Sequence, residues 1–367
     1  MDEKFFEELE SLKDRRQKTC DDIKSHGKPV IMFGAGEMAR LLTNDLKQFG
    51  LEIDGYSIDD KYYKPDQTYL GRPIYNFSEL STQPEKYIFV LGLNDEGGRR
   101  SLSFLLDKTL NCYSVMPNLG MPITYDWIMS NRRQLTETFN WLEDDLSRRT
   151  MRAYLKQKVS RDPSFNIDVC QPNQYFNELT YVCGGGLRRS YIDCGAYRGD
   201  TIEQFINWSG GAYEKILGVE ADPINFAALD RFIRSKAYEN VELFNGGVWN
   251  ERATLTFNGL SNTSSAIAEG GDVSIRADRI DAIVDEIGLS NVGLIKMDVE
   301  GAELNALRGA VETIKRDKPN LAICVYHKTE DLITVPQFIK NLNADYKFFL
   351  RKHTVVTDVE LVLYAII

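Results

Sequence analysis

Three carboxylates stand close together at the end of one apolar stretch of this sequence. Asp298, Glu300 and Glu303 fall within six residues and follow the apolar Leu294 and Ile295. Like charges this close repel one another unless they meet a cation, a hydrogen-bond donor or a reacting proton. The pattern therefore indicates either acid–base chemistry or a site for a divalent cation. The ordinary alternative, most apt for Glu303, is that acidic residues are favoured at a helix N-terminus.

A second run with the marks of a binding loop begins where an apolar segment reaches Asp193. Gly195 and Gly199 would let the backbone turn where a side chain would collide with a ligand. Asp200 or Thr201 can cap the helix that follows. The spacing is G-x-x-x-G, whereas a dinucleotide site normally has G-x-G-x-x-G. An acidic strand end also suits the cationic amino group of a methionine moiety better than a pyrophosphate. A tight strand–helix turn without a ligand is the alternative.

Two more predicted strands end in polar side chains. Glu220 ends one of them, and its carboxylate could accept hydrogen bonds from both hydroxyls of a ribose. Ala221 and Asp222 follow it directly, and Glu220 could instead be only a neighbour of a helix N-cap. The next strand ends at Asn245, whose amide could meet the edge of an adenine.

His327 is the histidine best placed for acid–base work among the three in the chain, because it directly follows the apolar run 321–326. It would lie near Asp298 if their strands are neighbours. A surface histidine without a role is the alternative. Gln174 and Tyr175 precede the first strand of this half, where a cover over a bound ligand would lie, although ordinary aromatic packing would also explain them.

The N-terminal part contains a strand followed by Gly34-Ala35-Gly36 and a helix, and a second strand that ends at Asp59. This is the opening of a Rossmann-like unit, and G-x-G-x-x-A is a weak form of its fingerprint. Such a loop could hold a second nucleotide, present a sugar acceptor, or only dock against the other domain.

Alternating strands and helices predict an α/β protein whose parallel sheets have helices outside. The divisions that we expect are an N-terminal helix (1–27), a Rossmann-like domain (28–125), a helical connector or cover (126–180) and a second α/β domain (181–367). Seven strands are expected in the last domain, at 191–194, 215–220, 241–244, 292–298, 321–326, 347–351 and 360–366. The first five should be parallel, and the last two, joined without a helix, should form an antiparallel pair at one edge.

Composition excludes several classes of protein. The net charge is −10 without an evident Lys/Arg cluster, so we expect no nucleic-acid partner. We see no signal peptide and no apolar run long enough to span a membrane, and a cytoplasmic location is expected. The six cysteines are scattered without a CxxC pair, which argues against zinc and against a disulfide scaffold.

Taken together, these motifs resemble the FkbM family of methyltransferases over about residues 130–367. The segments that carry the resemblance are 192–196, 199–201, 219–223, 280–281, 296–303 and 307–310, and the run Lys-x-Asp-x-Glu-Gly-Ala-Glu at 296–303 is the most specific. Cys194 stands where Val or Ile is common, and Tyr197-Arg198 replaces Asn-Val or Asn-Ile. Neither departure removes a polar contact that the loop needs.

The resemblance implies a class I methyltransferase fold, with a doubly wound seven-stranded sheet, and S-adenosylmethionine as the methyl donor. It also implies an acceptor hydroxyl on a sugar, a glycan or a polyketide-like natural product. The residues expected at the donor are Asp193, Gly195, Ala196, Gly199, Asp200, Thr201, Glu220, Ala221, Asp222, Asn245, Gln174 and Tyr175.

An alcohol is a poor nucleophile until its proton is removed, so a base or a metal ion is expected. Asp298 and His327 are the candidates for the base, whereas Asp298, Glu300 and Glu303 could instead hold a divalent cation.

Two rival functions stay open at this point. One is an NAD(P)-linked oxidoreductase that uses Gly34, Gly36 and Asp59. The other is a non-catalytic nucleotide-sugar-binding scaffold. The sequence does not identify the acceptor or the position methylated, and it leaves open whether the protein is a homo-oligomer.

Overall fold

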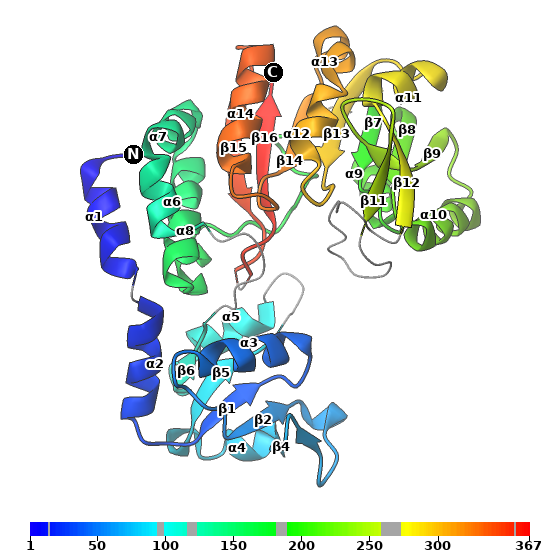
Figure 1. Cartoon of the computed structure of the whole chain (residues 1–367). Coiled ribbons are helices and arrows are strands. Elements are labelled where there is room, and N and C mark those ends of the chain that lie inside the picture. The colour runs from blue at the N-terminus through cyan, green and yellow to red at the C-terminus, as the bar shows by residue number, and fades with distance from the viewer. Residues whose placement is uncertain (14, 94–98, 116–122, 181–188, 258–272, 356) are drawn as a thin grey trace. The chain divides into compact units, whose positions relative to one another are not determined.

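The chain is a mixed α/β protein, as expected, with parallel pairing in more than one sheet. The computed structural model describes residues 1–367 except 14, 94–98, 116–122, 181–188, 258–272 and 356, so Cys183 lies outside the described residues (Figure 1). The described chain forms two compact units. Unit 1 comprises Met1–Phe139, Asp145–Pro172 and Lys352–Glu360, and unit 2 comprises Asn140–Asp144, Asn173–Arg351 and Leu361–Ile367.

Unit 1 contains a six-stranded sheet in the order β3-β4-β2-β1-β5-β6. Its strands are β1 (Val30–Phe33), β2 (Gly55–Ile58), β3 (Thr68–Tyr69), β4 (Arg72–Asn76), β5 (Ile88–Leu91) and β6 (Cys112–Tyr113). Every pairing between neighbours is parallel except that of β3 with β4. The helix α3 (Glu37–Lys47) follows β1 and buries Ala39, Leu42 and Leu46 because these residues recur at helical spacing.

The N-terminal segment was expected to be one helix and is two, α1 (Glu3–Leu12) and α2 (Arg15–Ser25). The two helices pack against different neighbours. The guanidinium of Arg152 in α8 lies over the ring of Phe5 in α1. By contrast, Cys20 and Ile23 of α2 pack in the apolar core of the six-stranded sheet. The break between the helices allows α1 to contact α8 and α2 to pack against the sheet. The spacing of apolar residues alone did not reveal this break.

The remaining helices of unit 1 are α4 (Phe77–Leu80), α5 (Arg99–Leu106), α6 (Tyr125–Ser130), α7 (Arg132–Trp141, whose last two residues belong to unit 2) and α8 (Asp145–Ser160), with short 3₁₀ turns η1 (Asp60–Tyr62), η2 (Pro84–Lys86) and η4 (Pro163–Asn166). The expected connector is therefore helical, but α8 packs with the late segment Lys352–Glu360 as part of unit 1. Lys158 and Asp358 form a buried ion pair, 2.7 Å apart, between these two parts. The domain boundaries proposed from the sequence stay predictions.

Unit 2 contains a seven-stranded sheet in the order β15-β16-β14-β13-β7-β8-β9. Its strands are β7 (Arg189–Cys194), β8 (Tyr213–Glu220), β9 (Val241–Asn245), β13 (Val292–Met297), β14 (Asn320–Cys324), β15 (Lys347–Lys352, whose last residue belongs to unit 1) and β16 (Leu361–Ile366). The first five in chain order are parallel, as predicted, and β16 runs antiparallel to β14.

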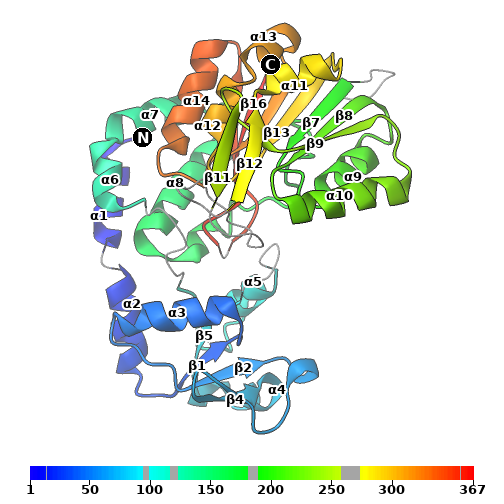
Figure 2. The same cartoon turned by 45° about the vertical axis from the view of Figure 1, so that its right-hand side comes forward.

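Helices cover the sheet of unit 2. They are α9 (Asp200–Trp208), α10 (Pro223–Lys236), α11 (Ile280–Glu286), α12 (Glu303–Arg308), α13 (Val311–Asp317) and α14 (Asp331–Leu342). One face packs Tyr191 and Leu294 against Phe205 of α9 and Leu229 of α10 in a single apolar cluster. Figure 2 shows α9 and α10 side by side near β8 and β9.

A small sheet was not foreseen from the sequence. It contains β10 (Gly247–Val248), β12 (Val273–Asp278) and β11 (Ala253–Phe257), in that order. Only β10, with two residues, is too short to show a pattern. The sequences of β11 and β12 do alternate between apolar and polar residues, with Leu255, Ile275 and Ala277 among the apolar positions, so this signal was present and was missed.

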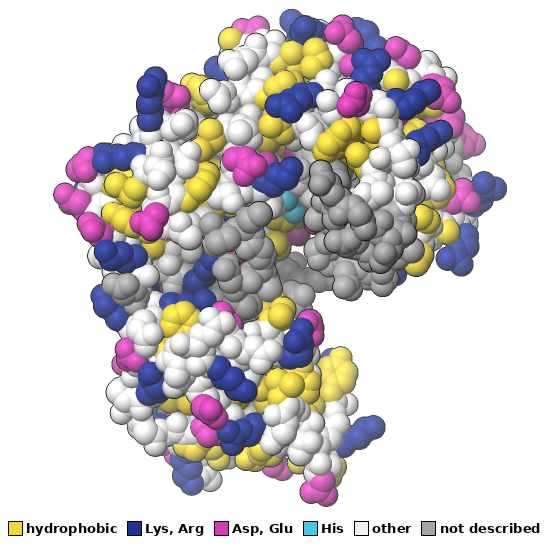
Figure 3. Space-filling model, viewed as in Figure 1, with side chains coloured by type: hydrophobic (Ala, Val, Ile, Leu, Met, Phe, Trp, Pro, Cys, Tyr) yellow, Lys and Arg dark blue, Asp and Glu magenta, His cyan; other side chains and the backbone are white. Residues whose placement is uncertain are grey.

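Charged side chains of both signs lie on the surface (Figure 3). On the face drawn in Figure 3, acidic and basic side chains of the described residues are interspersed. Among the described residues, no helix is both long and apolar enough to cross a membrane.

Candidate functional site

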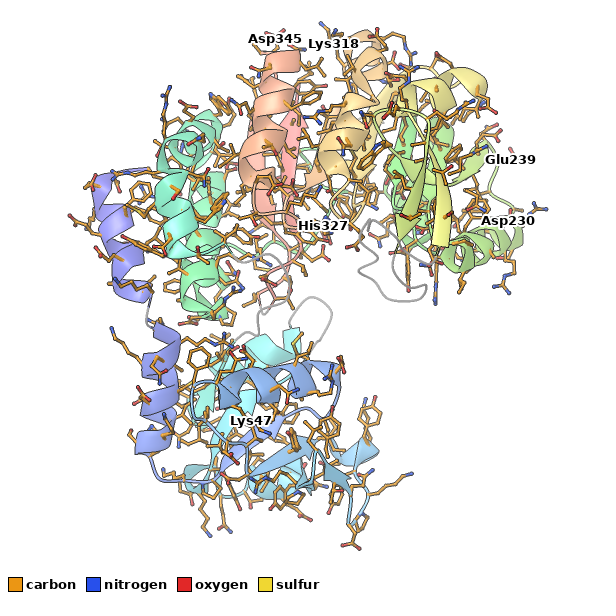
Figure 4. The ribbon with its side chains drawn as sticks, in the orientation of Figure 1. Lys47, Asp230, Glu239, Lys318, His327 and Asp345 are labelled. Carbon is orange, nitrogen blue, oxygen red and sulfur yellow. The ribbon has the colours of Figure 1, made fainter. Side chains whose placement is uncertain are left out.

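The carboxyl ends of β7, β8, β13 and β14 lie at one edge of the sheet of unit 2, because these strands are parallel neighbours. Figure 4 labels His327 at this edge, three residues after β14, with Lys318 and Asp345 at the opposite end of the sheet. Doubly wound sheets bind ligands at the carboxyl edge of their strands. The polar side chains singled out in the sequence of this half therefore lie at the edge where a ligand is expected.

Asp193 does not face a ligand site, contrary to our expectation for the donor amino group. Its side chain has no exposed surface. One carboxylate oxygen lies 3.0 Å from the Lys296 ammonium, and the other accepts a hydrogen bond from the Thr201 hydroxyl. Because both oxygens are engaged within the protein, Asp193 is a counter-ion inside the core of the site. Thr201 is likewise directed inward.

Lys296 was not among the predicted site residues, yet it connects most of this edge. Its ammonium lies 2.6 Å from the carbonyl oxygen of Gly195 and 3.4 Å from that of Cys194, in addition to its pairing with Asp193. Burial lowers the pKa of Lys296, but the carboxylates of Asp193 and Asp298 raise it by more, so the net shift is upward. A lysine within the otherwise apolar run 292–297 was the signal that the sequence offered.

The glycines of the loop are required by contacts within the protein itself. Gly195 has φ +83°, and a Cβ there would lie 1.9 Å from the carbonyl oxygen of Asp298. Gly199 has φ +97°, and its Cβ would lie 2.6 Å from the ring of Phe232. Positive φ and contact with the protein itself require glycine at these two positions, so no collision with a ligand has to be invoked.

Glu220 lies at the end of β8 and is largely buried, with 8% of its surface exposed. Its carboxylate accepts hydrogen bonds from the backbone amides of Tyr197 and Asp222, at 2.8 Å each. Burial raises its pKa above the ordinary value, opposed by these two amides. A carboxylate can accept about four hydrogen bonds, so acceptor capacity is left over.

The other residues predicted around the donor have mixed surroundings. Asp222 is the N-cap of α10, because its carboxylate accepts from the amides of Ile224 and Asn225. Ala196 is buried and Ala221 is half-buried, while Asp200 is exposed at the first position of α9. Asp222 is thus a structural cap.

Asn245 is exposed and lines a pocket of about 400 Å³ beside β9. The pocket is lined by Leu217, Leu243, Phe244, Asn245, Arg276, Ile283, Glu286 and Ile287. The guanidinium of Arg276 lies over the Phe244 ring, 4.3 Å from its centroid. The pocket is therefore of mixed character, with polar groups of Asn245, Arg276 and Glu286 beside apolar side chains.

Tyr175 belongs to the segment before β7 and contacts the acidic cluster directly. Its hydroxyl donates to Oδ2 of Asp298 at 2.9 Å, and the hydroxyl of Tyr326 donates to Oδ1 at 3.1 Å. Burial raises the pKa of Asp298, but Lys296, His327 and these two hydroxyls lower it by more. Asp298 is therefore held ionised, with 25% of its side chain exposed. Gln174, next to Tyr175, is half-buried.

His327 and Asp298 do come together, as the sequence predicted. The Nε2 atom of His327 lies 3.5 Å from Oδ1 of Asp298, and Nδ1 lies 2.7 Å from Oε1 of Glu303. Burial lowers the pKa of His327, but the carboxylates of Glu303, Asp298 and Glu300 raise it by more, to about 9. This raised pKa favours the protonated imidazole at neutral pH.

The three residues whose ligand atoms converge are Asp298, Glu303 and His327, all within 4.8 Å of one another. The predicted cation set had Glu300 in place of the histidine. The backbone of Glu300 has φ +51°, and 41% of its side chain is exposed. Its Oε2 atom lies 3.5 Å from Nε2 of His327. One oxygen of Glu303 is buried without a hydrogen-bond partner.

In unit 1, Gly34 and Gly36 follow β1, and Asp59 follows the neighbouring strand β2. Gly34 has φ +114°, and a Cβ there would lie 2.6 Å from the carbonyl oxygen of Gly92. Gly36 is the N-cap of α3 with open space around its Cβ position. These three residues therefore share the carboxyl edge of the sheet of unit 1, on neighbouring strands.

Residues 193–349 match the family model described as the methyltransferase FkbM domain. This confirms the predicted resemblance for that part of the chain, and the match includes Asp193, Asp298 and His327. No curated protein matches the chain by sequence.

One solved structure matches the fold over nearly the whole chain. The chain is similar to the methyltransferase FkbM from Methylobacillus flagellatus, with a TM-score of 0.72 and 23% identity over 99% of this chain and 98% of that one. An rRNA methylase from Streptococcus thermophilus matches at a TM-score of 0.32 and 12% identity over 48% of this chain and 85% of that one. Fibrillarin from Aeropyrum pernix, solved with bound S-adenosyl-L-methionine, matches at a TM-score of 0.34 and 11% identity over 51% of this chain and 71% of that one.

The fold, the family match and the clustered strand ends together support a methyltransferase. The oxidoreductase alternative is not favoured, because the matched region, 193–349, lies within unit 2 and does not include the glycine loop of unit 1.

Proposed function

We propose that the protein is an S-adenosylmethionine-dependent O-methyltransferase that acts on a hydroxyl of a sugar, a glycan or a related natural product. The observation that carries the proposal is that the FkbM match spans the strand ends where Glu220, Asp298 and His327 lie. We also propose that the seven-stranded sheet of unit 2 is the doubly wound sheet of class I methyltransferases. The order of its strands and the antiparallel pairing of β16 support this.

The residues present fit such a donor. Glu220 is an ionisable group at a strand end with unused acceptor capacity, suited to ribose hydroxyls. Asn245 with its adjoining pocket offers an apolar surface and an amide for an adenine. S-adenosylmethionine, when bound, supplies an electrophilic methyl group. The chain must hold the acceptor oxygen in line with it, and orientation of this kind accounts for much of the rate of a two-substrate reaction.

The acidic cluster would handle the proton of the acceptor. Asp298 is kept ionised and oriented by Tyr175 and Tyr326, so it can accept a hydrogen bond from an incoming hydroxyl. His327 becomes a base only after losing its own proton, which its three carboxylate neighbours oppose. Turnover by this route therefore rises as the pH approaches the raised pKa of His327.

A divalent cation is the second route to an activated hydroxyl. The convergence of ligand atoms from Asp298, Glu303 and His327 favours it, and imidazole with carboxylates is a donor set that binds divalent cations such as Mn²⁺. In that case His327 is a neutral ligand and is not the base.

Unit 1 is proposed to be a Rossmann-like domain that binds a nucleotide or a sugar acceptor, or that docks without binding either. Its sheet order, with β1 between β2 and β5, and the positions of Gly34, Gly36 and Asp59 support the comparison. We further propose a cytoplasmic protein with a small-molecule or glycan substrate and without a nucleic-acid partner.

The experiment is a methyl-transfer assay with labelled S-adenosylmethionine and a panel of nucleotide sugars and oligosaccharides. His327→Ala should lower turnover by roughly 100-fold while donor affinity stays close to wild type. His26→Ala is the matched control, since His26 lies in unit 1 at the end of α2. If His327→Ala turns over at the wild-type rate on an accepted substrate, His327 has no role in the chemistry.

A further inference from the structure

Lys296 is an unusual residue for its position. It lies within the buried strand β13, and 2% of its side chain is exposed. Removing an ammonium group from water is costly even after the protein relaxes, so a buried lysine persists only with strong partners. Lys296 has three, all at the end of the neighbouring strand β7: the Asp193 carboxylate and the carbonyl oxygens of Cys194 and Gly195.

These partners place Lys296 at the base of the proposed donor loop. The segment after β7 leaves the strand through Gly195, and its next amides, those of Gly195 and Ala196, donate to the carbonyl oxygen of Val219. Lys296 acts on the other side of the same turn by holding the Gly195 carbonyl at 2.6 Å. The path of the loop is thus fixed by strand β8 from one side and by the ammonium group from the other.

The same ammonium also borders the acidic cluster. It lies 5.3 Å from the centroid of the Tyr175 ring, and Tyr175 donates to Asp298. Among the influences that lower the pKa of Asp298, Lys296 is the largest. One buried side chain therefore contacts the donor loop and stabilises the charge of the carboxylate on which acceptor chemistry would depend.

We propose that Lys296 is the positioning residue of the donor site, which fixes the loop of Gly195 by its ammonium group and uses Asp193 as its counter-ion. The inference rests on the proposed function, because it gives the loop the task of holding S-adenosylmethionine. It reassigns Asp193, expected from the sequence to meet the donor amino group, to the support of Lys296. Its distinctive claim is that the contact with the carbonyls matters, apart from the neutralisation of charge.

A double-mutant comparison separates the two contributions. Lys296→Met leaves Asp193 as an unpaired buried charge, which is strongly destabilising, whereas Asp193→Asn with Lys296→Met removes both charges and restores much of the stability. The matched control is Lys215→Met, because Lys215 is a half-buried lysine on β8 of the same sheet and donates to the Ile287 carbonyl at 3.0 Å. The readouts are thermal unfolding, affinity for S-adenosylhomocysteine by calorimetry, and amide hydrogen exchange of residues 194–199.

We expect the double variant to unfold near the wild-type temperature, to bind S-adenosylhomocysteine about tenfold or more weakly, and to exchange the loop amides about tenfold faster. Lys215→Met should retain wild-type affinity and loop exchange. The proposal is overturned if the double variant regains wild-type affinity and loop protection, because charge balance alone then suffices. Should the single Lys296→Met variant fail to fold, the double variant still decides.

A failure of the proposed function is distinguishable from a failure of this inference. If the wild-type protein does not bind S-adenosylhomocysteine, the proposed function fails on that result. Amide exchange in the ligand-free protein then decides the role of Lys296 alone. Unchanged exchange of residues 194–199 in the double variant contradicts the positioning role, and faster exchange supports it.

Discussion

The imidazole Nδ1 of His327 lies 2.7 Å from Oε1 of Glu303, a carboxylate whose side chain has no exposed surface. This contact orients the imidazole ring. Its other nitrogen, Nε2, therefore faces Asp298 and Glu300 and lies 3.5 Å from a carboxylate oxygen of each. It also raises the pKa of the histidine. The acid–base character of the site thus depends on a buried residue that the sequence suggested only as a metal ligand or an acidic residue at a helix start.

The first prediction concerns that pKa. In Glu303→Gln the histidine loses the largest influence that raises its pKa, so the pKa should fall from about 9 towards the ordinary value. NMR titration of the His327 ring, with a chelator present to exclude metal, measures it. Glu312→Gln, an exposed glutamate in the first turn of α13, is the control and should change nothing. A pKa of His327 that stays at its wild-type value in Glu303→Gln contradicts the assignment.

The same shift predicts how stability varies with pH. The folded-state pKa of His327, about 9, is above the reference value of 6.5. The folded state therefore binds more protons between these values, and its extra stability is full below about pH 6.5 and is lost as the pH rises to about 9. Urea unfolding at several pH values should show a steeper decline over this window in wild type than in His327→Gln. Parallel curves for the two proteins would rule out a raised pKa.

The third prediction concerns the donor site. Glu220→Ala should weaken binding of S-adenosylhomocysteine by about 1–3 kcal/mol, the cost of leaving buried hydroxyls without an acceptor. Because Glu220 also accepts two backbone amides, the loop should loosen as well. Glu220→Gln keeps one acceptor oxygen but turns its NH2 group towards one of the two backbone amides. It should therefore lose some affinity, but less than Glu220→Ala. Affinity unchanged in both variants removes Glu220 from the donor site.

The fourth prediction tests the turn after β7. Gly195→Ala places a Cβ 1.9 Å from the Asp298 carbonyl in a backbone with φ +83°, so the variant should lose more than about 2 kcal/mol of stability or fail to fold. Gly210→Ala is the control, because Gly210 has φ +61° and open space around the Cβ position. It should cost only about 1 kcal/mol. Equal losses in chemical denaturation would mean that the contact with Asp298 is unimportant.

Much of unit 2 could be predicted because its strands are continuous apolar runs that end in polar residues. The five parallel strands lie within two residues of the predicted bounds, and Asp298 and His327 meet because β13 and β14 are neighbours. Strand order and the edge at which side chains meet follow from general rules of parallel sheets. Periodicity was therefore sufficient for the scaffold.

The partners of each side chain could not be predicted in the same way. Asp193 was assigned to a ligand because the sequence does not show that Lys296, 103 positions later, lies beside it in register. The pKa of His327 depends on Glu303 and Asp298 together, and the sequence does not show how close these carboxylates lie to the imidazole ring. The break between α1 and α2 and the packing of residues 352–360 in unit 1 depend on contacts distant in sequence.

The central claim is that the chain binds the methyl donor and not a nicotinamide dinucleotide. One calorimetric titration of the full-length protein with S-adenosylhomocysteine, and a parallel titration with NAD, tests it most directly. The account predicts saturable one-site binding of S-adenosylhomocysteine, weakened by Glu220→Ala and unaffected by Gly36→Ala, whose added Cβ meets open space. It predicts no heat from NAD that depends on Glu220. Binding of NAD together with no heat from S-adenosylhomocysteine would contradict it.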